Sequence, residues 1–186
     1  MSTRPAILLG RLLPAAAALA LACGPLTPAR NAAAVTAAPV TVAWRADSLS
    51  ITVPDSASLS SGTAGSTLSA SLGTVTVLDT RGGNPIWTAT VASTDFTTGA
   101  PVRTITKANV SYWSGPATAA SGGGSRVPGQ ATAAQKVTLT TSATAFSGRK
   151  LNGIANSTSW EPTLVITVPA AAAAGTYTGT VTHSVA

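Results

Sequence analysis

The chain has 186 residues, of which only 9 % are charged, and its 45 % hydrophobic fraction consists mainly of alanine and valine. This length allows one domain with a sizeable core, and the ordered alternation of threonine with valine excludes a disordered chain. From Val35 onward, eight basic and five acidic residues leave a charge of +3. Because these bases form no stripe, the composition excludes nucleic acid as the expected partner.

The first 34 residues are predicted to be a secretory signal peptide with a spacer. Arg4 and Arg11 supply the positive end, and Leu12 to Ala22 supply a short apolar run. That run is shorter than the roughly 20 residues that cross a bilayer. Cleavage after Ala22, Ala34 or Ala37 fits the small residues nearby. We therefore expect a protein that is secreted to the cell surface of a bacterium.

Cys23 is the one cysteine of the sequence and ends the apolar run, in LALACG. It is either the lipidated first residue of a bacterial lipoprotein or a residue removed with the signal peptide. Membrane association is therefore expected only through a possible lipid anchor. With a single cysteine, no intramolecular disulfide can form, and the domain must be held by its core.

The mature chain, residues 35–186, is predicted to be one all-β domain. A Pro/Ala-rich linker, residues 24–39, precedes strand-like segments that alternate with Gly/Pro turns, and no segment has a helical period. This pattern predicts a two-sheet antiparallel β-sandwich of about nine strands. The predicted strands are Val40–Arg45, Leu49–Pro54, Thr74–Leu78, Ile86–Ala92, Val102–Thr106, Asn109–Trp113, Lys136–Thr141, Thr163–Val168 and Thr176–Val185.

The alternation also predicts which side chains lie inside. Trp87, Ala89 and Val91 share one face of their strand. Leu164, Ile166 and Val168 share another, and His183 is in phase with Val181 and Val185. The glycines at 122–124 lack the strand–loop–helix context of a phosphate cradle and are predicted to form a mobile loop.

No catalytic, cofactor or metal site is expected. His183 is the one histidine, and the sequence contains no G-x-S-x-G nucleophile turn. One histidine, one cysteine and dispersed aspartates supply no transition-metal or calcium constellation. We therefore predict a protein that is not an enzyme and uses no cofactor.

Two segments resemble the WxL-domain family of bacterial surface proteins, in its short high-GC Gram-positive version. They are LGTVTVLDTRGGNPIWTATVASTDF and WEPTLVITVPAAAAAGTYTGTVTHSVA. Asp79, Arg81, Gly82 and Trp87 match the first family motif, with Ala89 in place of its leucine. In the last segment, which starts at Tyr177, His183 stands where the second motif has tryptophan. The resemblance implies non-covalent association with the cell wall through peptidoglycan.

Candidate contact residues follow from the aromatic side chains. Tyr112, Trp113 and Trp160 adjoin strand ends and are proposed to stack on glycan sugars, whereas Trp87 is expected in the core. Asp79 is expected to bind turn amides, and Arg81 to pair with Asp79 or Asp95. The sequence thus predicts a cell-wall-binding module. The alternative is an assembly subunit that pairs its strands with other surface proteins.

Overall fold

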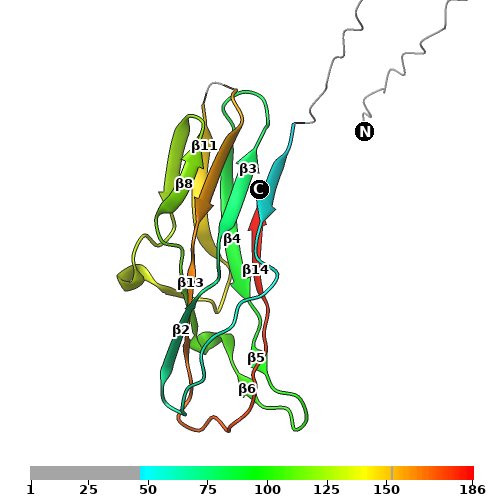
Figure 1. Ribbon diagram of the computed structural model, residues 1–186, viewed down its shortest axis with the longest axis vertical. Coiled ribbons are helices and arrows are strands. Elements are labelled where there is room, and N and C mark those ends of the chain that lie inside the picture. The colour runs from blue at the N-terminus through cyan, green and yellow to red at the C-terminus, as the bar shows by residue number, and fades with distance from the viewer. Residues whose placement is uncertain (1–46, 152) are drawn as a thin grey trace, which may run out of the picture. The chain divides into compact units, whose positions relative to one another are not determined.

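The computed structural model describes residues 47–151 and 153–186, and within these ranges the chain is all-β, as predicted (Figure 1). Fourteen strands and two single 3-10 turns make up its regular structure. The strands are β1 (Leu49–Thr52), β2 (Thr67–Ser71), β3 (Val75–Asp79), β4 (Ile86–Ser93), β5 (Phe96–Thr97), β6 (Thr104–Ile105), β7 (Val110–Trp113), β8 (Ala117–Ser121), β9 (Gly124–Pro128), β10 (Val137–Thr138), β11 (Ala143–Lys150), β12 (Asn156–Trp160), β13 (Thr163–Thr167) and β14 (Val181–Val185).

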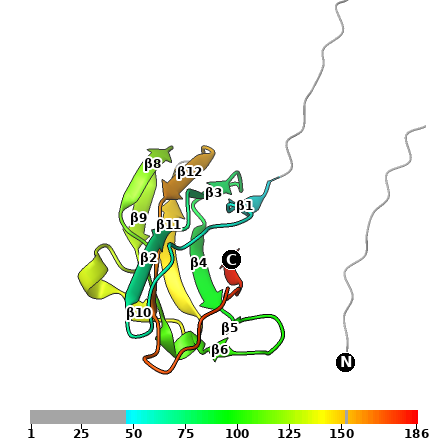
Figure 2. The ribbon, with the colours of Figure 1, turned by 60° about the horizontal axis from the view of Figure 1, so that its bottom comes forward.

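The strands form three four-stranded antiparallel sheets, with the strand orders β1-β3-β12-β8, β10-β7-β13-β2 and β14-β4-β11-β9. A small fourth sheet pairs β5 with β6. The first two sheets are linked by four passages of the chain: a long one from β1 to β2, and three short ones from β2 to β3, β7 to β8 and β12 to β13. Figure 2 shows β8, β12, β3 and β1 of the first sheet in one row, with β9, β11 and β4 of the third sheet in a second row beside it.

The sequence located eight of these strands and missed six. The predicted strand Val40–Arg45 lies outside the described residues. The missed strands are β2, β5, β8, β9, β11 and β12, and most are rich in Ser, Thr, Ala or Gly. Such segments have little intrinsic preference for a strand and take it from their partners in the sheet. The expected loop at 122–124 is corrected in part, because Gly124 is the first residue of β9.

Core side chains come from both sides of this arrangement. Trp87, Ala89 and Val91 on β4 are buried, as their alternation predicted, and so are Leu164 and Ile166 on β13. Two aromatic residues, Phe146 on β11 and Trp160 on β12, belong to the same buried core cluster. The large rings add volume to a core that otherwise consists of valine, alanine, leucine and isoleucine.

The lack of a side chain at Gly148 leaves space for the indole ring of Trp87. Gly148 on β11 lies opposite Trp87 on β4, and a β-carbon at Gly148 would stand 2.5 Å from indole atoms Cε2 and Cζ2. Carbon atoms in contact lie about 3.5–4.0 Å apart. The absence of a side chain at position 148 therefore allows the indole to lie flat against β11.

Candidate functional site

The turn after β3 is held by an ion pair between Asp79 and Arg81. The Asp79 carboxylate is fully buried and accepts hydrogen bonds at 3.0 Å from the Arg81 backbone N–H, from Nε and from a terminal guanidinium nitrogen. Burial acts to raise the pKa of Asp79, but these hydrogen bonds and the charges of Arg81 and Lys150 together lower it below its usual range. The structure shows Arg81 paired with Asp79, and Asp95 accepts instead from the Lys107 backbone N–H.

Two buried polar side chains beside this turn were not singled out from the sequence. Lys150 at the end of β11 is fully buried, and its ammonium donates to the Arg81 carbonyl. Asn156 lies opposite Asp79 and donates through Nδ2 to the Gly123 carbonyl at 3.1 Å. In the sequence Lys150 follows Arg149 and resembles a surface charge. Only the packing of β11 against the turn reveals its role.

Two of the three proposed glycan contacts are buried. Tyr112 and Trp160 are each 0 % exposed, so neither offers a ring face to a surface ligand, and this expectation is corrected. Tyr112 alternates inward on β7, and the Trp160 ring stacks on Phe146 with centroids 4.8 Å apart. Trp113 is half-buried and is the one of the three with an accessible side chain.

Tyr112 connects the core to His183 on the edge strand β14. Trp160 Nε1 lies 3.5 Å from Tyr112 Oη, and His183 Nε2 lies 3.1 Å from the same oxygen. The indole nitrogen can only donate, so we assign the Tyr112 proton to the bond with His183 Nε2. Burial lowers the pKa of His183 to about 4 and raises that of Tyr112. At neutral pH the imidazole is therefore uncharged, with its proton on Nδ1.

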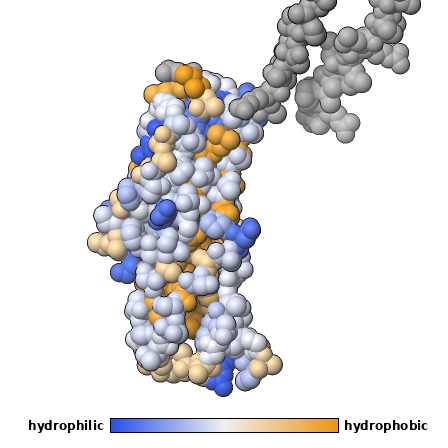
Figure 3. Space-filling model, in the orientation of Figure 1, coloured by the Kyte–Doolittle hydropathy of each residue, from blue (hydrophilic) through white to orange (hydrophobic). Residues whose placement is uncertain are grey.

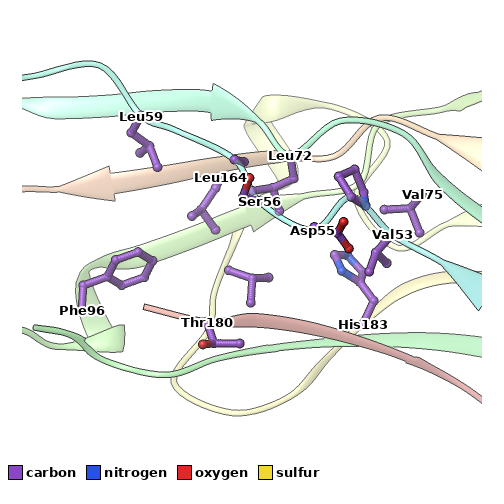
Figure 4. A pocket seen from close by; sticks show the side chains of 13 residues that line it. Val53, Asp55, Ser56, Leu59, Leu72, Val75, Phe96, Leu164, Thr180 and His183 are labelled. Carbon is purple, nitrogen blue, oxygen red and sulfur yellow. The ribbon is translucent and has the colours of Figure 1, made fainter. Parts of the chain in front are cut away.

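A hollow of about 150 Å³ lies beside His183, between β14 and the segment that follows β1. Figure 4 shows Phe96 at one end and His183 near the other, with Leu59, Leu72 and Leu164 along the wall. Asp55, Ser56 and Thr180 add polar groups, and all three are exposed. An apolar floor with a few polar groups at its rim suits a small group that has an apolar part and a hydrogen-bonding part.

Two other residues singled out by the resemblance, Gly82 and Tyr177, make hydrogen bonds within the domain. Gly82 donates its N–H to the Asp47 carboxylate at 3.1 Å. Tyr177 is part-buried against the core and donates through its hydroxyl to the Ala173 carbonyl at 2.9 Å. Cys23, the proposed lipidation site, lies outside the described residues.

Within residues 47–151 and 153–186, no three His, Cys, Asp or Glu side chains gather as metal ligands. Over these ranges, no helix has the length and apolar character needed to cross a bilayer. No known protein family, curated protein or solved structure matches the chain.

Proposed function

We propose that this chain is an exported, non-catalytic module of the WxL type that associates non-covalently with the bacterial cell wall. Its strands would form a two-layer sandwich, with β14-β4-β11-β9 as one layer and the other two four-stranded sheets as the second. The three short chain passages between those two sheets support this arrangement, because they join them end to end. The export signal and the resemblance support the location.

The hollow beside His183 carries the proposal for the binding site. The resemblance places His183 where the family has a tryptophan, and the smaller imidazole leaves room in front of β14. N-acetylated sugars of a cell-wall glycan would fit its chemistry. The acetamido methyl would rest on Leu59 and Leu164, and the amide would face the polar groups of Asp55 and Ser56.

The experiment is sedimentation of residues 35–186 with isolated cell-wall sacculi over a salt series. We expect saturable pelleting that persists at high salt and is reduced by N-acetylglucosamine. Pelleting that disappears as salt rises would show charge attraction alone and contradict the proposed site.

Variants then locate the contact. Ser56→Trp, at an exposed rim position, should abolish pelleting by filling the hollow, and Asp55→Asn, at the neighbouring exposed position, should weaken it without affecting folding. Thr182→Trp is the matched control, because Thr182 is exposed and does not line the hollow. If both site variants pellet like the unmodified chain, the hollow is not the site. Loss in Trp113→Ala alone would assign binding to that ring.

The alternative function is assembly with other surface proteins by strand pairing. Strand β8 favours it, because all five of its residues are exposed and it pairs only with β12 among the described strands. An edge of this kind can accept a further strand. Absence of pelleting together with a mass that rises with concentration in size-exclusion chromatography would favour assembly over wall binding.

A further inference from the structure

One end of the domain carries aliphatic side chains that the core does not use. Ile86 is 64 % exposed, Ile154 61 % and Leu151 39 %. We call these three residues the apolar tip. Figure 3 shows hydrophobic residues gathered at the top of the molecule, the end at which the β11 label stands in Figure 1.

The backbone holds the apolar tip together. The Gly153 N–H donates to the Gly83 carbonyl at 3.2 Å, and the Lys150 N–H donates to the Pro85 carbonyl at 2.9 Å. These bonds join the turn before β4 to the turn after β11. Ile86 and Leu151 thus project from two adjoining turns of a fixed framework.

The formal charges of Arg81, Arg149, Lys150, Asp47 and Asp79 sum to +1 at this end. Arg149 is exposed, lies opposite Ile86 in the register of β11 with β4, and has no ion pair among the described residues. Buried Asp79 pairs with Arg81, and exposed Asp47 keeps its negative charge while its carboxylate accepts from the Gly82 N–H. Aliphatic side chains beside such a cation suit a surface that is apolar inside and anionic outside.

The preceding part of the chain joins the domain at the same end. Asp47 is the first described residue and is bonded to Gly82, next to the apolar tip. The 46 residues before it contain the predicted export signal and Cys23. A chain tethered to a membrane through that segment would hold the domain near the bilayer at a high effective concentration.

We propose that the apolar tip is a membrane-contact surface, which inserts Ile86, Leu151 and Ile154 into the interface of an anionic lipid bilayer while Arg149 contacts lipid headgroups. Short aliphatic insertions of this kind bind weakly by themselves and gain from a tether or from anionic lipid. This contact is independent of the wall-binding site proposed above, which lies beside His183.

The test is co-sedimentation of residues 35–186 with vesicles of equal parts phosphatidylglycerol and phosphatidylcholine at low salt. All the described strands and the buried core cluster lie within this range. We expect measurable partitioning that falls on the order of tenfold in Leu151→Ser/Ile154→Ser. Arg149→Gln should weaken binding to these vesicles and leave binding to pure phosphatidylcholine unchanged.

Val102→Ser is the matched control, because Val102 is 74 % exposed in the loop between β5 and β6, at the opposite end of Figure 1. It should bind vesicles like the unmodified chain. Unchanged thermal unfolding of both variants shows that folding is intact. No partitioning by the folded chain, or equal loss in Val102→Ser, would overturn the proposal. Self-association that Leu151→Ser/Ile154→Ser abolishes, without vesicle binding, would assign the apolar tip to a second copy and also overturn it.

Discussion

Replacing Gly148 with alanine should destabilise the protein, although such a change often stabilises a chain. A new β-carbon would lie 2.5 Å from two carbon atoms of the Trp87 indole and 2.8 Å from its Nε1. Reaching ordinary contact requires a shift of about 1 Å. Trp87 is 1 % exposed and its ring stacks on Phe146, so no free space receives it.

The magnitude follows from two opposing effects. Overpacking of a filled core costs about 1–3 kcal/mol, and the lower entropy of the unfolded alanine chain returns about 0.4–1 kcal/mol. We expect Gly148→Ala to lose about 1–2 kcal/mol in urea unfolding. Gly99→Ala is the control, because no atom lies within 4 Å of its added carbon and its φ lies outside the left-handed region. It should be neutral or slightly stabilising.

A double-mutant cycle tests the cause. In a Trp87→Leu background the added methyl has room, so Gly148→Ala should there cost less than in the unmodified chain. If Gly148→Ala is as stable as the unmodified chain, or if its cost is the same in both backgrounds, the close approach of Trp87 to Gly148 does not explain the glycine.

Four further changes should alter the free energy of unfolding. Lowering the pH from 6.5 to 4 should destabilise the protein by at most about 3 kcal/mol, because in that window the unfolded state binds a proton at His183 and the folded state does not. Urea unfolding at pH 7, 5.5 and 4 should show this loss of stability. An equal loss in His183→Gln would refute the explanation. The lowered pKa of Asp79 predicts a separate loss below about pH 3.8, and circular dichroism on acid titration should show that loss disappear in Asp79→Asn. At pH 7 Asp79→Asn should cost about 2–4 kcal/mol in urea unfolding, because it leaves the guanidinium of Arg81 unpaired. The control Asp95→Asn, at an exposed position, should cost less than about 1 kcal/mol. Equal costs for the two variants would contradict the stabilising role of the buried Asp79–Arg81 ion pair. Tyr112→Phe should cost about 1 kcal/mol, measured as a shift in thermal unfolding, because it removes the hydroxyl between Trp160 and His183, and no shift would contradict that bond.

The segments that the sequence located well are those in which large apolar residues alternate with threonine. In β4, Trp87, Ala89 and Val91 face inward at every second residue, and the burial of the strand follows the same period. In β13, Leu164 and Ile166 do the same. Alternation is a local property of a half-buried strand, so it can be detected without knowledge of the partners.

The segments that the sequence missed have no such property. Strand β8 reads ATAAS and is exposed at every position, and its pairing with β12 depends on residues about 40 positions away. Two of the three glycan candidates, Tyr112 and Trp160, are buried for a related reason. Tyr112 and Trp113 alternate, and the period alone does not say which of the two faces the core.

The sequence by itself determined the all-β class, the buried face of β4 and the turn after β3, because these depend on neighbours within a few residues, whereas the structure decided that Arg81 pairs with Asp79 and not with Asp95. Tertiary structure decided that Trp160 and Tyr112 are internal, that Lys150 is buried under the Arg81 carbonyl, and that His183 borders a hollow. Each of these positions results from the contact of strands distant in sequence, where the burial of a side chain depends on what the facing sheet supplies.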